Sequence, residues 1–191
     1  PSLLAKEQNA SIPTTNLSTV CTLSNCTLSG SLPHGIYVAT AANSNVSLNA
    51  FTAPANQDYV FLINGNLTIN GPISVPVGST LIFSINGNIT VSSTVGAATP
   101  TSTTPNLDGW YIAGQSFILP TAGNCTDLRL NIAGSVVVNA LGTGGTLQNS
   151  RDLCGNDTTY PTISFLQRLD MILNAPQFLQ DQRITSQEVS P

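Results

Sequence analysis

Hydrophobic and polar residues alternate along several short segments of this chain, and one alternating segment is repeated. Residues 62–69 read Leu-Ile-Asn-Gly-Asn-Leu-Thr-Ile, and residues 84–91, which start 22 positions later, read Ser-Ile-Asn-Gly-Asn-Ile-Thr-Val. Successive side chains of a β-strand point to opposite faces, so Ile63, Leu67 and Ile69 share one face. A repeat of this length with β-branched alternation predicts the stacked coils of a β-solenoid, with the aliphatic residues inside.

Two weaker copies of the repeat follow, at residues 111–118 and 131–138. The Ile-x-Gly element recurs at offsets of 22, 27 and 20 residues. Aligning all four copies places the following residues on the outside of the later coils: Ala113, Gln115, Phe117, Ala133, Ser135 and Val137. That wall is no longer fully polar, so we expect the disulfide-linked loop, the C-terminal tail or another subunit to cover it.

These patterns predict an all-β fold, a right-handed parallel β-helix or solenoid with a C-terminal tail packing on it. We divide the chain into an N-terminal segment (1–32), the solenoid body (33–149) and the tail region (150–191). The N-terminal segment could be an extended or exchanged strand, or a disordered linker. The apolar residues of the tail after Ile163 favour a short element packed on one end of the solenoid over a free binding helix.

Charged residues make up only 7% of the chain, against about 25% in ordinary soluble proteins. Asparagine, serine and threonine therefore have to supply the polar surface. The five basic residues are scattered, which excludes nucleic acid as a partner. The sequence has no run of 18 apolar residues, so we expect no direct membrane insertion.

The four cysteines fall into two plausible pairs, Cys21 with Cys26 and Cys125 with Cys154. Their spacing and the single histidine, His34, favour disulfides over a metal site or free thiols, and hence an oxidising compartment. The chain lacks an initiator Met and a complete signal peptide, so we expect a mature product whose export signal has been removed. Eight Asn-x-Ser/Thr sites are possible glycosylation sites: Asn9, Asn16, Asn25, Asn45, Asn66, Asn88, Asn124 and Asn156.

No catalytic group, metal site or cofactor is indicated, and we predict that the protein is not an enzyme. Asp108, Asp127 and Asp152 could converge in space as hydrolytic carboxylates, but solvated loop positions are favoured. The 142–145 segment, Gly-Thr-Gly-Gly, lacks the lysine of a phosphate loop and is interpreted as a turn. His34, between a proline and a glycine, is interpreted as an ordinary turn residue.

Four residues of the later coils are candidates for surface contacts: Trp110, Tyr111, Phe117 and Val137. Trp110 and Tyr111 could stack on a sugar, although burial under the 95–107 loop is an equal alternative. Thr68 and Thr90 could belong to an ordered ice-binding array, although strand propensity alone explains threonine there.

The end of the chain carries a family resemblance. Residues 168–176 read Arg-Leu-Asp-Met-Ile-Leu-Asn-Ala-Pro, residues 187–191 read Gln-Glu-Val-Ser-Pro, and residues 150–153 read Ser-Arg-Asp-Leu. These segments resemble the C-terminal signature of large secreted surface proteins of candidate-phyla-radiation bacteria. That signature usually has proline where Leu169 stands, an aromatic residue at Ser186 and alanine at Ser190. The resemblance implies a cell-surface location and a natural C-terminus, and it implies no reaction.

Together these observations predict an extracellular structural or adhesive surface protein, either a filament or surface-layer subunit or the distal part of an adhesin. We expect it to associate with itself, with another cell-surface protein or with a glycan. The alternative hypothesis is a carbohydrate-binding or carbohydrate-processing solenoid, or an ice-binding one.

Overall fold

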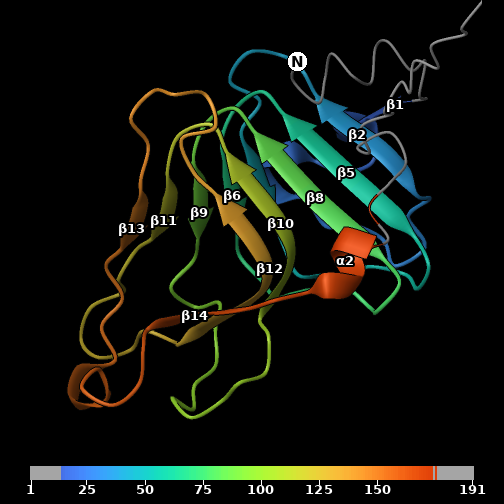
Figure 1. Ribbon diagram of the computed structural model, residues 1–191. Coiled ribbons are helices and arrows are strands. Elements are labelled where there is room, and N and C mark those ends of the chain that lie inside the picture. The colour runs from blue at the N-terminus through green and yellow to red at the C-terminus, as the bar shows by residue number, and fades with distance from the viewer. Residues whose placement is uncertain (1–13, 174, 176–191) are drawn as a thin grey trace, which may run out of the picture.

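The computed structural model describes residues 14–173 and Ala175, which form a parallel β-solenoid (Figure 1). Every pairing between its strands is parallel. The larger sheet, sheet A, contains β1 (Thr14–Asn16), β2 (Gly35–Ala39), β4 (Phe51–Thr52), β5 (Asp58–Ile63), β7 (Ile73–Ser74), β8 (Thr80–Ile85), β10 (Leu107–Ala113), β12 (Leu130–Val137) and β14 (Ile163–Leu166). The smaller sheet, sheet B, contains β3 (Val46–Leu48), β6 (Leu67–Ile69), β9 (Ile89–Val91), β11 (Phe117–Leu119) and β13 (Leu147–Asn149).

Each coil contributes one long strand to sheet A and one short strand to sheet B. The five coils begin at β2, β5, β8, β10 and β12. Helical structure among the described residues is limited to four short pieces: η1 (Leu17–Thr19), η2 (Leu23–Asn25), η3 (Cys154–Asn156) and α2 (Leu169–Leu173). The predicted all-β parallel solenoid is therefore confirmed.

The central repeat pairs as the sequence predicts. Ile63 lies beside Ile85 in sheet A, and Leu67 lies beside Ile89 in sheet B. All four side chains are buried in the interior of the solenoid, with exposed fractions of 2% or less. One coil of 22 residues therefore stacks on the next, and its aliphatic residues form a continuous core.

The two later copies of the repeat pair in a different register from the predicted one. Ala113, rather than Ile112, pairs with Ile85, and a register shift of one residue turns every side chain to the opposite face. Ala113 and Phe117 therefore lie in the core instead of on the outside. Gly134 pairs with Gly109 rather than stacking on Gly114, so this coil is 25 residues long instead of 20. The long connection from β9 to β10 shifts the register of the next coil by one residue. An alignment that matches the repeated sequence alone does not predict this shift.

Stacked aromatic rings form one column of the interior. Tyr37, Phe61, Phe83 and Tyr111 occupy the same position in four successive coils. The distances between the centroids of adjacent rings are 5.2, 5.0 and 5.6 Å, with nearly parallel planes. Offset stacking of this kind adds to the free energy gained by burying the rings.

Asparagine side chains connect the coils at the turn between the two sheets. Asn45 Oδ1 accepts hydrogen bonds from the backbone N–H and the side-chain amide of Asn66, both at 2.9 Å. Asn66 Oδ1 then accepts from the Asn88 N–H at 2.8 Å, and Asn88 Oδ1 accepts from the Ser116 N–H at 2.9 Å. This asparagine ladder satisfies backbone donors that the turn would otherwise leave unpaired.

Glycine is required next to this ladder. A Cβ atom on Gly87 would lie 2.3 Å from Asn66 Oδ1 and 2.6 Å from the Gly65 carbonyl oxygen. The repeated glycine therefore permits a close approach of one coil to the next.

The two ends of the solenoid are built differently. Residues 14–28 form a partial coil at the N-terminal end: β1 pairs with β2, and Cys26 forms a bridge with Leu48 of sheet B. The Cys21–Cys26 disulfide closes this partial coil, and Leu17 seals the core beneath it. The N-terminal segment thus contributes a strand to its own sheet, whereas residues 1–13 lie outside the described part of the chain. At the C-terminal end, β14 pairs with β12, and α2 follows it.

Candidate functional site

The last coil leaves part of its edge open. β14 pairs with Leu130–Ala133, the first half of β12. Within the described part of the chain, Gly134–Val137 pair with β10 on one side and with no strand on the other. Strand β13 likewise pairs only with β11. Both sheets therefore end here in strands with unpaired backbone groups, which are templates for a further strand.

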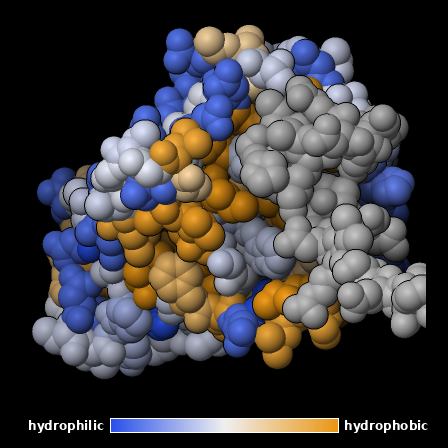
Figure 2. All heavy atoms as spheres, turned by 45° about the horizontal axis from the view of Figure 1, so that its top comes forward, coloured by the Kyte–Doolittle hydropathy of each residue, from blue (hydrophilic) through white to orange (hydrophobic). Residues whose placement is uncertain are grey.

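Apolar side chains surround this open edge. A hollow of about 430 Å³ opens at the end of the solenoid and is lined by Gly134, Ser135, Val136, Val138, Leu147 and Phe165. Val137, Leu147 and Phe165 are 45%, 43% and 49% exposed. Figure 2 shows hydrophobic atoms gathered over one face of the molecule, with hydrophilic atoms along their left side. Among the described residues, no buried side chain covers the core at this end as Leu17 does at the other.

The outer face of sheet A is also apolar. Ile36, Val60, Leu62 and Ile82 form a second buried cluster, separate from the interior core. The repeat did not predict this cluster, because its two clear copies carry polar residues on their outer face. The signal was present in Asp58–Ile63, where five consecutive buried hydrophobic residues follow the aspartate, because strands buried on both faces lack alternation.

A groove separates the tail from this outer face. It measures about 460 Å³ and is lined by Trp110, Ile112, Gly134, Ser135, Val137, Gln167, Arg168 and Ile172. Figure 1 shows α2 in front of sheet A. The tail therefore packs on the solenoid, as predicted, and it covers part of the apolar wall of the last coils.

Arg168 fixes the tail in this position. Its Nη1 donates to the Val75 carbonyl at 3.0 Å, and Nε and Nη2 donate to the two carboxylate oxygens of Asp170, each at 2.7 Å. Asp108 lies 3.7 Å from Arg168 Nη1 and accepts the Val75 N–H at 2.8 Å. The Arg168 hydrogen bonds lower the pKa of Asp170, whereas burial raises the pKa of Asp108. The bidentate pair with Asp170 holds the guanidinium in place, and its bond to Val75 connects the tail to a coil about ninety residues earlier.

Replacing Asp170 with Asn should loosen α2 at neutral pH. The folded-state pKa of Asp170 is lowered, so the carboxylate stabilises the docked tail above its unfolded pKa of about 4 and loses this effect as the pH falls through the folded value. Trp110 is the only tryptophan and lines the groove, so its emission should shift to the red. We expect the wild type to show this shift only in acid and Asp170→Asn to show it at pH 7. Asp58→Asn is the control, and an unshifted Asp170→Asn spectrum would contradict the proposed clamp.

A second buried arginine organises the loops at the same end. Arg151 Nη1 donates to the carbonyls of Val95 and Leu128, at 2.8 and 2.7 Å, and Nη2 donates to that of Ser92 at 2.7 Å. Its side chain is only 6% exposed, and burial lowers its pKa to about 10, so it stays charged at neutral pH. Counting a longer bond of 3.5 Å to the Val91 carbonyl, one guanidinium thus donates to four carbonyls of two different coils.

The three candidate carboxylates do not form one cluster. Asp127 Oδ2 accepts the backbone N–H of Asp152 at 2.8 Å, so these two residues are neighbours. Asp127 also accepts the Ala122 N–H, and Asp152 accepts the Cys154 N–H. Asp108 belongs to the separate Arg168 clamp. All three therefore hold backbone groups in place.

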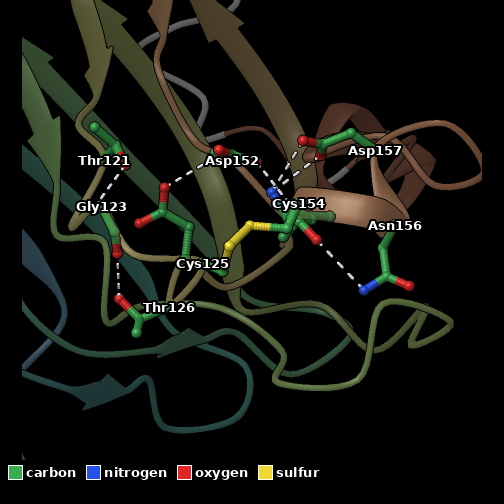
Figure 3. Close-up of a disulfide and its surroundings, with 10 residues drawn as sticks. Thr121, Gly123, Cys125, Thr126, Asp152, Cys154, Asn156 and Asp157 are labelled. Carbon is green, nitrogen blue, oxygen red and sulfur yellow. Dashed lines mark hydrogen bonds between the residues drawn. A yellow bond between two sulfur atoms is a disulfide. The ribbon is translucent and has the colours of Figure 1, made fainter.

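Both predicted disulfides are present. Cys21 pairs with Cys26, and Cys125 pairs with Cys154, with Cα–Cα distances of 5.0 and 5.5 Å. Figure 3 shows the second bond joining the loop before β12 to the start of η3, beside Asp152 and Asp157. This bridge attaches the loop that precedes the last coil to the loop that follows it.

Two of the four predicted contact residues are wrong. Tyr111 and Phe117 are fully buried in the interior and cannot contact a partner. Their assignment failed because of the register shift in β10. Trp110 is half-buried in the groove beneath the tail, and Val137 is exposed at the open edge.

The remaining candidate positions are His34, Thr68 and Thr90. His34 is exposed just before β2. Thr68 and Thr90 are neighbours on the outer face of sheet B, and their column continues in Ser47, Ile118 and Gln148. A column with two threonines is not an extended threonine array.

The possible glycosylation sites differ in their surroundings. Asn16 caps η1, Asn25 accepts a hydrogen bond from Asn49, and Asn66 donates its side-chain amide to Asn45 in the ladder. A sugar on the Asn66 amide nitrogen would compete with that bond. The Asn88 side chain accepts the Ser116 N–H of the next coil, whereas Asn124 is exposed in a loop and Asn156 is exposed at the end of η3. Asn9 lies outside the described residues.

Residues 14–173 and Ala175 contain no group of three or more metal-ligating side chains. Within the same residues, no helix has the length and hydrophobicity to span a bilayer. The sequence matches no family model, no curated protein and no solved structure.

Proposed function

We propose that this chain is an extracellular structural or adhesive surface protein that associates with itself to form a filament or a surface layer. The observation that carries the proposal is the unsealed C-terminal end of the solenoid. There an apolar hollow lies beside Gly134–Val137 and β13, which have no partner strand on their outer side within residues 14–173. Soluble proteins usually protect such edges, so an open edge favours a partner strand.

Other features support a role in contact rather than in catalysis. The charged side chains Asp127, Asp152 and Arg151 hold backbone groups, and Asp108 and Asp170 hold Arg168. Polar contacts between the coils come mainly from neutral asparagines. Two disulfides are typical of proteins in oxidising surroundings outside the cytosol.

Self-association is tested on the purified chain and on native cells. Light scattering over a range of concentrations should show growth beyond the monomer, and electron microscopy of shed surface material should show an ordered polymer or layer. Antibody labelling identifies the chain in that material. A chain that stays monomeric at every concentration, together with shed material free of ordered polymer, would refute self-assembly and leave adhesion.

Glycan binding is a second candidate, and the groove at Trp110 favours it. This aromatic side chain lies beside the polar groups of Ser135 and Gln167, a combination that suits stacking and hydrogen bonding to a sugar. On a glycan array, a positive signal should be lost in Trp110→Ala and retained in Trp110→Phe. Ice binding has less support, because the threonine column has only two members.

A further inference from the structure

The strand register shows where one copy would meet the next, if the chain self-associates as proposed above. Thr14 of β1 pairs with Ile36, and the same column continues through Val60, Ile82 and Trp110 to Ser135 of the last coil. Asn16 begins the column that ends at Val137. Strand β1 therefore begins three columns of paired residues at the N-terminal end. The same three columns end at Ser135, Val136 and Val137, which have no partner strand on their outer side among the described residues.

The strand that follows the last coil leaves these columns vacant. β14 pairs with Leu130–Ala133 and ends at Leu166. The chain then leaves the sheet, and Gln167 and Arg168 line the groove on its outer face. β14 thus pairs with only the first half of β12. The other half, at Ser135–Val137, has the length of the three-residue strand β1.

Sheet B is arranged in a matching way. At the N-terminal end, the partial coil adds Cys26 beside Leu48 of β3. At the C-terminal end, β13 is the last strand and has no partner on its outer side among the described residues. A partial coil that reaches from sheet A to sheet B therefore meets an open edge in both sheets.

The two ends are also compatible in charge. Residues 14–28 and 134–149 contain no Asp, Glu, Lys, Arg or Pro. Charged residues and prolines are the usual means by which edge strands avoid pairing with another chain. The N-terminal end presents the partly buried Val20 and Leu23, and the C-terminal end presents the apolar hollow at Val136 and Leu147.

We infer that copies of this chain stack head to tail, with β1 of one copy added in parallel to Ser135–Val137 of the preceding copy. Thr14 then lies opposite Ser135, Thr15 opposite Val136, and Asn16 opposite Val137. The two contacting surfaces differ, so each copy keeps one free end and the assembly grows as a filament. The added strand pairs with the half of β12 that β14 leaves without a partner, and main-chain hydrogen bonds supply the affinity.

Cysteine cross-linking tests the register directly. Thr14 and Ser135 are both exposed, and neighbouring strands bring Cα atoms close enough for a disulfide. The described part of the native chain has no free cysteine. A mixture of Thr14→Cys and Ser135→Cys chains should give a cross-linked dimer on mild oxidation. The control mixture of Thr14→Cys with Ser74→Cys, which is exposed on β7, should not.

A charged substitution tests whether the cross-link depends on the open edge of β12. Adding Val137→Lys to the Ser135→Cys chain should reduce the cross-link to the level of the control mixture, because a charge on the open edge opposes strand addition. Val77→Lys places the same charge on a residue that is 78% exposed away from this end and should leave the cross-link intact. Circular dichroism verifies that each variant is folded.

The outcomes separate the two proposals. Self-association without the cross-link, and unaffected by Val137→Lys, would overturn head-to-tail stacking and leave the proposed function standing. Absence of any self-association would contradict both. A photo-cross-linker at Ser135 that joins to its own chain, or to a different protein in shed surface material, would also overturn the inference. Attachment to residues 14–16 of an isotope-labelled second copy supports it.

Discussion

Replacing Phe83 with Ala should lower the free energy of unfolding by about 3–5 kcal/mol. Phe83 is 1% exposed, and its ring is stacked between Phe61 and Tyr111. Truncation removes both ring contacts and leaves a cavity in the middle of the aromatic column, where two coils on either side hold the walls apart. Each kcal/mol corresponds to roughly 2–4 °C in Tm for a chain of this size. Thermal unfolding followed by circular dichroism should therefore show a fall of about 10 °C.

Two variants control this measurement. Phe83→Leu fills most of the volume and should cost much less than the alanine substitution. Val77→Ala removes methyl groups from an exposed position and should leave the Tm unchanged. If Phe83→Ala lowered stability by less than about 1 kcal/mol, the coils would be closing over the cavity. The interior would then be less rigid than the stacked rings indicate.

Replacing Arg151 with Ala should destabilise the C-terminal end of the solenoid by about 3–5 kcal/mol. The guanidinium donates to the carbonyls of Val95, Leu128 and Ser92 and, at 3.5 Å, to that of Val91. Alanine would remove these donors, and of the four carbonyls that of Ser92 would keep the Val95 N–H. Leaving a buried acceptor unpaired costs about 1–3 kcal/mol for each group, although water entering the gap reduces the sum. Hydrogen exchange read by mass spectrometry should show faster exchange at residues 92–97 and 127–130 than in the wild type.

Arg129→Ala is the matched control for this second experiment. Arg129 is equally buried, but its guanidinium donates to one carbonyl, that of Pro100. Its replacement should cost less and should affect the 98–102 loop. Arg151→Lys keeps the charge but loses the planar fork, so its stability should fall between the wild type and Arg151→Ala. Equal losses for Arg129→Ala and Arg151→Ala would show that the number of carbonyls held is unimportant.

The sequence predicted the fold where the repeat is regular and failed where a loop changes its phase. Ile63 and Ile85 belong to coils of equal length, so identical positions stack and the spacing alone revealed the register. Between β9 and β10, the inserted loop shifted the pairing by one residue, and the inside and outside of residues 111–118 were exchanged. A shift of a single residue leaves composition unchanged, so only the three-dimensional pairing could reveal it.

The candidate site was only partly predictable for a similar reason. Val137 was correctly placed outside, and the tail was one of three candidates, with the disulfide-linked loop and another subunit, for covering the later coils. The unpaired half of β12 depends on where β14 ends, which is a property of pairing rather than of sequence pattern. The resemblance in the tail rests on segments that contain Arg151 and Arg168. Both side chains hold backbone carbonyls of earlier coils, and no periodicity could have indicated those partners.

The positions of the two disulfides affect where the solenoid begins to unfold. In a stack where each layer contacts only its neighbours, unravelling starts at the outermost layers and proceeds inward. Cys21–Cys26 secures the first layer, and Cys125–Cys154 secures the last. Reducing agents should therefore convert a cooperative melting transition into a broad one, with the first and last coils unfolding first. Oxidised chains should resist proteolysis within residues 14–28 and 125–154 better than reduced chains do.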